Sequence, residues 1–84
     1  MDQQLYQKYL EELTLEALAK ANDNVPLAAD YLEKKQKPRF FNKDHREKKA
    51  ALERVKKVFI SSRERSLYVV LKSLGLDDLA KEKL

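Results

Sequence analysis

The sequence predicts an all-α protein, a compact small domain of four helices with room for a fifth short one. Apolar residues recur at the 3.6-residue spacing of a helix in several segments, and no segment alternates with period two, so no strand is expected. The chain contains one Gly and two Pro, which leaves few helix-breaking positions. Because 84 residues suit one domain, residues 1–84 are expected to form a single helical domain.

The first helix is predicted to begin after Asp2, a good N-cap residue, and to end near Ala21. Its apolar residues fall on one face: Leu5, Tyr6, Tyr9, Leu10, Leu13, Ala17 and Ala21. Leu15 and Leu18 lie off that face and form a second apolar stripe. This helix must therefore be covered on two sides, by its own chain or by a partner.

The second helix is predicted from about Val25 to Gln36. Asn24 supplies an N-cap, and Pro26 falls in the first turn, where its missing N–H costs nothing. Pro38 disfavours helical geometry in the residue before it and ends this segment.

The third helix is predicted from Asp44, which forms a capping-box pattern with Glu47, to about Ile60. Its apolar residues are expected to face inward: Ala51, Leu52, Val55, Val58 and Phe59. The spacing of Ser61 and Glu64 resembles a second capping box and predicts a break at Ser61–Ser62.

The fourth helix should then bury Leu67, Val70, Leu71 and Leu74. Gly75 stands where a left-handed C-cap is needed, and Leu76 can make the hydrophobic contact that follows such a cap. Asp77 is expected to cap a short last helical turn.

The composition excludes several classes of function. With no Cys and one His, the chain has no disulfide, thiolate metal site or Cys–His pair. A single Gly is too few for a glycine-rich phosphate loop. We therefore expect no catalytic residues, no metal, no cofactor and no small-molecule substrate. No signal-peptide or membrane-spanning pattern is visible, so a cytoplasmic protein without a membrane partner is expected.

Charge is distributed unevenly along the chain. The net charge is +4, but residues 1–33 carry −5, residues 34–65 carry +9 and residues 66–84 are balanced. A basic block of this density favours phosphate or an acidic partner.

Two segments resemble a Fis-type helix-turn-helix DNA-binding domain. Residues 16–32 read EALAKANDNVPLAADYL and resemble its first two helices, with Asn24, Ala28, Ala29 and Leu32 at matching places. Residues 60–76 read ISSRERSLYVVLKSLGL and resemble its recognition helix and exit. The resemblance is partial, because a helical insertion separates the segments and Val69 and Val70 follow the Leu-Tyr pair where the family tends to place basic residues. It implies that the last helix presents Arg63 and Arg65 to DNA from its N-terminal end.

The first functional interpretation is a small basic helical protein, with a regulatory role left open, that binds nucleic acid through phosphate contacts. DNA is favoured over RNA. The expected contact residues are Lys35, Lys37, Arg39, Arg46, Lys49, Lys56, Lys57, Arg63 and Arg65. Most of the affinity would be electrostatic and would fall as salt rises.

The alternative interpretation is a non-enzymatic adaptor or inhibitor that docks on a larger protein through its polarised charge and an exposed apolar stripe. The expected interface residues are Glu11, Leu15, Leu18, Phe40 and Phe41. The two Phe residues, set among basic ones, fit base stacking or closure of the core. The oligomeric state is left open by the sequence.

Overall fold

The computed structural model describes residues 2–35 and 45–84, and within these ranges the chain forms five α-helices and no strand. The helices are α1 (Gln3–Ala21), α2 (Val25–Lys34), α3 (His45–Ser61), α4 (Leu67–Ser73) and α5 (Asp77–Glu82). The predicted all-α class is therefore confirmed. Among the helices that the structure describes, none combines the length and the apolar character that crossing a bilayer requires.

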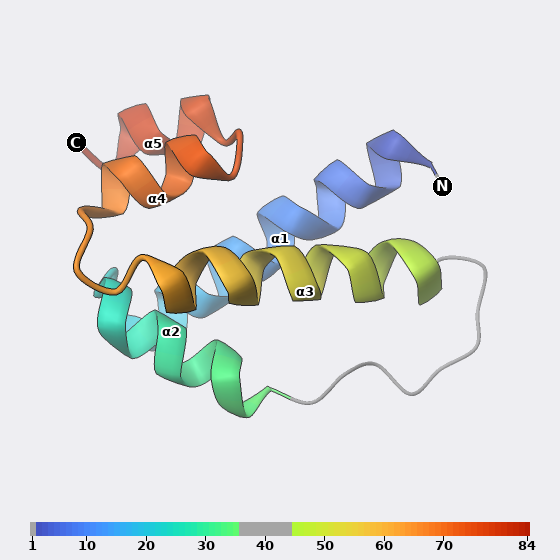
Figure 1. The fold of residues 1–84 in the computed structure, drawn as a ribbon. Helices are drawn as coiled ribbons and strands as arrows, with labels where there is room; N and C mark the ends of the chain where they lie inside the picture. The colour runs from blue at the N-terminus through green and yellow to red at the C-terminus, as the bar shows by residue number, and fades with distance from the viewer. Residues whose placement is uncertain (1, 36–44) are drawn as a thin grey trace.

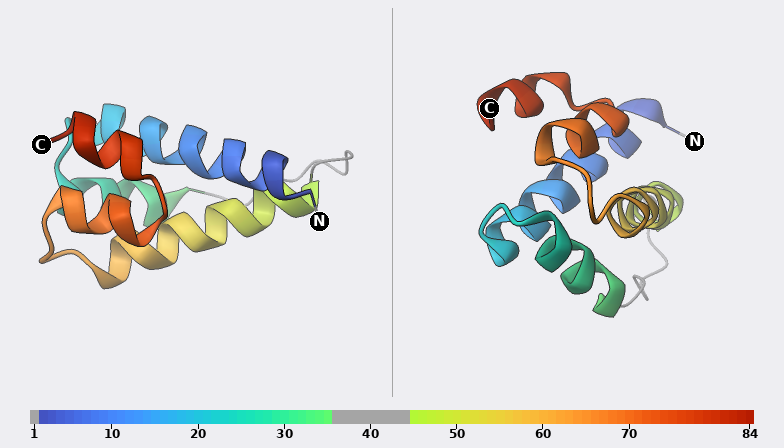
Figure 2. Two further views of the ribbon diagram at one scale, coloured as in Figure 1. Left: turned by 90° about the horizontal axis from the view of Figure 1, so that it is seen from above. Right: turned by 60° about the vertical axis from the view of Figure 1, so that its left-hand side comes forward.

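Three long helices pack together, and a short hairpin covers one side of them. Helices α1, α2 and α3 contact one another, and α4 pairs with α5 and also touches α3 (Figure 1). Both views of Figure 2 place the α4–α5 hairpin beside the C-terminal half of α1. Buried residues from all five helices form one hydrophobic cluster, with Phe59 of α3 the largest fully buried side chain.

The starts of the first two helices agree with the predicted caps. The Asp2 carboxylate accepts hydrogen bonds from the backbone N–H groups of Gln4 and Leu5, at 2.9 and 3.2 Å. The Asn24 side chain accepts one from the N–H of Leu27 at 3.0 Å, and Pro26 lies in the first turn of α2. These bonds satisfy donors that a helix start otherwise leaves unpaired.

Helix α1 is covered on two sides by its own chain. Leu18 is only 2% exposed and belongs to the core, whereas Leu15 is 43% exposed. The expectation of an exposed stripe containing both residues is therefore wrong for Leu18. The reason is that the α4–α5 hairpin lies beside α1 on a second side, different from the side of α1 that packs against α2 and α3 (Figure 2).

The predicted break at Ser61–Ser62 is found, because α3 ends at Ser61 and a turn begins at Ser62, but the predicted cap at Ser61 is wrong. Helix α3 includes Ser61, whose hydroxyl donates back to the Val58 carbonyl at 3.3 Å instead of capping a new helix. A turn follows, and α4 begins only at Leu67, where the Ser66 hydroxyl accepts the N–H of Val69 at 3.3 Å. The cap thus falls several residues later than the sequence pattern indicates.

Gly75 ends α4 as predicted. Its φ of 77° is left-handed. The N–H of Gly75 donates to the Lys72 carbonyl and that of Leu76 to the Leu71 carbonyl, both at 3.0 Å. These two bonds are those of a Schellman motif, and the buried Leu76 supplies its hydrophobic contact. Asp77 is not the cap of the last helix but its first residue, and its carboxylate pairs with Lys72 at 3.3 Å.

Glu47 links the starts of α1 and α3. The predicted start of α3 at Asp44 lies outside the described residues, and the helix is described from His45. Glu47 is only 6% exposed, and its Oε1 accepts the backbone N–H of Asp2 at 3.1 Å, although 45 residues separate them. The carboxylate thus helps to fix the N-terminus of α1 against α3.

Candidate nucleic-acid interface

The outward side of α3 carries three of the predicted nucleic-acid contacts, Arg46, Lys49 and Lys57, and all three are exposed. At about 100° per residue they fall within an arc of about 80° on the helix surface. Apolar residues such as Val55 and Phe59 occupy the opposite side and are fully buried. Because the apolar side of α3 packs into the core, the opposite side, which carries these three cations, faces solvent.

Arg54 is a further exposed cation that sequence reasoning missed. It lies about 80° from Arg46 around the helix, on the flank nearest α4, and its Nη2 donates to the Ser73 carbonyl at 3.3 Å. The same helical spacing that selected Arg46 could have found it. We define the α3 basic face as Arg46, Lys49, Arg54 and Lys57.

Lys56 lies at the edge of this face and contributes less to it. Its side chain is half-buried, and Nζ lies 3.5 Å from the Lys35 carbonyl oxygen, toward the end of α2. Glu53 is the acidic residue within the face and is exposed. The face therefore holds four outward cations around one carboxylate.

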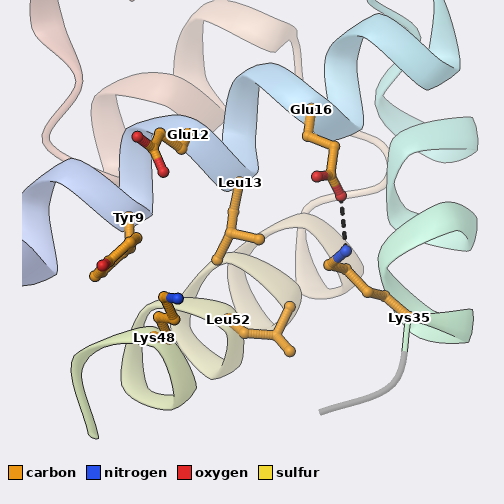
Figure 3. A pocket seen from close by; sticks show the side chains of 7 residues that line it. All are labelled: Tyr9, Glu12, Leu13, Glu16, Lys35, Lys48 and Leu52. Carbon is orange, nitrogen blue, oxygen red and sulfur yellow. Dashed lines mark hydrogen bonds and ion pairs between the residues drawn. The ribbon is translucent and has the colours of Figure 1, made fainter. Parts of the chain in front are cut away.

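Lys35 points into a groove instead of outward. The groove, of about 340 Å³, lies between α1 and α3 beside the end of α2 (Figure 3). Seven residues line it: Tyr9, Glu12, Leu13, Glu16, Lys35, Lys48 and Leu52. The Lys35 ammonium pairs with the Glu16 carboxylate at 2.8 Å, and Lys48 Nζ lies 5.2 Å from the centre of the Tyr9 ring. The ammonium groups of Lys35 and Lys48 therefore interact with residues that line the groove.

Glu16 is the centre of a small network in this groove. It accepts hydrogen bonds from Lys35 Nζ and, at 2.6 Å, from the Tyr31 hydroxyl. These bonds favour the charged carboxylate and hold the pKa of Glu16 below its ordinary value. The same bonds raise the pKa of Tyr31 and of Lys35, because each would lose the interaction on deprotonation. Lys35 therefore serves to join α2 to α1.

Arg63 is also engaged within the chain. Its guanidinium pairs with Asp30 at 2.6 Å and with Glu33 at 2.8 Å, one helical turn apart on α2. The hydrogen bond to Asp30 is the main cause of a raised pKa for Arg63. Arg63 lies in the turn before α4, so the expectation that the last helix presents it from its N-terminal end is wrong.

Arg65 lies in the same turn and is exposed, but it too precedes α4 instead of forming its first turn. The predicted set of nine therefore does not act as one surface. Three members lie together on α3 with Lys56 at their edge, Lys35 and Arg63 are held in ion pairs, and Arg65 lies in the turn before α4. Lys37 and Arg39 lie outside the described residues.

The residues of the alternative protein interface do not all lie on the described surface. Glu11 and Leu15 are exposed on α1, Leu18 is buried, and Phe40 and Phe41 lie outside the described residues. In the described ranges the other exposed large apolar side chains are Leu27 of α2, Val69 of α4 and the C-terminal Leu84. The stripe on which this interpretation depended is thus reduced to Leu15.

Within residues 2–35 and 45–84, no group of three or more His, Cys, Asp or Glu side chains is placed to hold a metal ion. Comparison of the chain with protein-family models, with curated proteins and with solved structures found no match. The resemblance to a Fis-type helix-turn-helix therefore stays a prediction.

Proposed function

We propose that the protein binds nucleic acid, DNA in preference to RNA, through phosphate contacts made by the α3 basic face. The observation that carries this proposal is that Arg46, Lys49 and Lys57 are all exposed on one side of a single helix. Among the described residues none of the three has an acidic partner within ion-pair distance, in contrast to Lys35 and Arg63.

The packing of α3 gives these cations a fixed spacing. Core residues on the opposite side hold the helix against α1 and α2. Arg46 and Lys57 are therefore kept about 16 Å apart along a rigid rod, at 1.5 Å per residue. Cations held in position lose less side-chain and backbone freedom on binding than cations in an unstructured tail, so more of their attraction to phosphate is retained.

The experiment is fluorescence anisotropy with a labelled DNA duplex at low salt, using the full chain. The test variant is Arg46→Gln/Lys49→Gln/Lys57→Gln. The control variant removes the same amount of charge from exposed positions on α1 and α5: Lys8→Gln/Lys20→Gln/Lys81→Gln. Helix content by circular dichroism confirms that both variants fold.

We expect the test variant to lose binding and the control to retain most of it, because a local face acts through short-range phosphate contacts. Equal losses in the two variants would show that net charge alone attracts DNA. No binding by the unaltered protein would refute the proposed function, and a pull-down centred on Glu11 and Leu15 would then address the protein-binding alternative.

A further inference from the structure

We propose that the nucleic acid is double-stranded B-form DNA and that α3 lies along its major groove. This inference rests on the proposed function and names the class of ligand for the same face. It follows from the position of α3 in the fold, from the spread of its cations around the helix and from the side chains absent from its outward surface.

Helix α3 lies at the edge of the molecule. In the right-hand view of Figure 2 it is seen nearly end-on, and the other helices lie to one side of it. Figure 1 shows the N-terminal half of α3 extending past α4 and α5. A helix with its side chains is about 10–12 Å across, and the major groove of B-form DNA is about 12 Å wide. An edge helix of 17 residues, about 25 Å long, can therefore enter the groove.

The cations of the basic face occur on both flanks of the outward arc. Lys49 lies about 60° to one side of Arg46, and Arg54 lies about 80° to the other. A helix in the major groove has a phosphate backbone on each side, so cations on both flanks find partners. A single row of phosphates, as in one strand, would meet only one flank at a time.

The outward face of α3 has no aromatic side chain. Besides the four cations, this arc holds Ala50, Glu53, Ile60 and Ser61, none of them aromatic, whereas Phe59 is fully buried on the opposite side. Binding of single strands depends largely on bases stacked on exposed rings, so this face is poorly suited to them. An RNA duplex is also a poor ligand, because its major groove is too deep and narrow for side chains to read.

The experiment compares three labelled ligands of one sequence at the same salt: a 20-base-pair DNA duplex, one of its strands, and the RNA duplex. We expect the DNA duplex to bind about tenfold more tightly than either of the others, because groove entry adds contacts to both strands. The Lys49→Gln and Arg54→Gln variants should each weaken duplex binding, since they remove one cation from each flank, and Lys81→Gln should not.

The outcomes separate this inference from the proposed function. Equal binding of the RNA and DNA duplexes would refute groove entry while leaving phosphate binding by α3 intact. Equal or tighter binding of the single strand would refute a duplex ligand. Loss of affinity in only one of the two flank variants would also contradict the arrangement, and no binding to any ligand would overturn the proposed function itself.

Discussion

Replacing Leu18 by Ala should destabilise the protein by about 2 kcal/mol more than replacing Leu15 by Ala. The two leucines lie three residues apart on α1, but Leu18 is 2% exposed and Leu15 is 43% exposed. At about 0.8 kcal/mol per buried carbon, Leu→Ala costs about 2.4 kcal/mol in transfer free energy at Leu18 and at most about 1.4 at Leu15. The closed cavity left at Leu18 brings its cost to about 3–4 kcal/mol.

The assay is urea unfolding followed by circular dichroism, with the slope checked for two-state behaviour. A difference of about 2 kcal/mol corresponds to a melting temperature about 8–16 °C lower for the Leu18 variant than for the Leu15 variant. Two variants of equal stability, or a larger loss at Leu15, would refute the packing of the α4–α5 hairpin against α1.

Three further predictions follow from local geometry. Gly75→Ala should lower the free energy of unfolding by about 1 kcal/mol, because an added Cβ meets no atom within 4 Å and only the left-handed φ of 77° opposes a side chain. Gly75→Asn should cost less, since Asn adopts left-handed φ more readily than Ala. Equal costs in thermal unfolding would contradict this reasoning. Because the pKa of Glu16 is lowered on folding, the stability that it adds is present above its ordinary pKa of 4.5 and is lost as pH falls through the folded pKa. Urea midpoints from about pH 7 to pH 3 should therefore fall less in Glu16→Gln, and an unchanged pH dependence would refute the network. Lys35→Gln and Arg63→Gln should leave DNA affinity within about twofold in anisotropy titrations, since both cations are paired within the chain; a loss as large as that of Lys49→Gln would be inconsistent with that pairing.

Features decided by neighbouring residues could be predicted from the sequence. The caps at Asp2 and Asn24 and the left-handed Gly75 depend on a side chain or a φ angle acting on its own turn of helix. The inward positions of α3, such as Val55 and Phe59, follow from helical spacing alone. The outward cations Arg46, Lys49 and Lys57 follow from the same spacing.

Features decided by distant residues could not be predicted. Glu16 and Lys35 are 19 residues apart, and Arg63 lies 30 residues from Glu33, so their pairing depends on how α1, α2 and the turn before α4 meet. Likewise, Leu18 is buried, and Figure 2 places a hairpin from the other end of the chain beside the half of α1 that contains it. The capping-box pattern also fails to find the start of α4, because Ser61 has Glu64 three residues later and is not a cap, whereas Ser66 has Val69 there and caps the helix.

The most direct test of the central claim is the salt dependence of binding to duplex DNA by the unaltered protein. Four phosphate contacts from the α3 basic face predict that the logarithm of the binding constant falls with the logarithm of salt at a slope of about −3.6. Affinity would then fall about 150-fold between about 50 and 200 mM salt. In Arg46→Gln/Lys49→Gln/Lys57→Gln, the slope should approach about −0.9, since one cation of the face remains. A slope near zero, or one that the triple variant leaves unchanged, would contradict phosphate binding by α3.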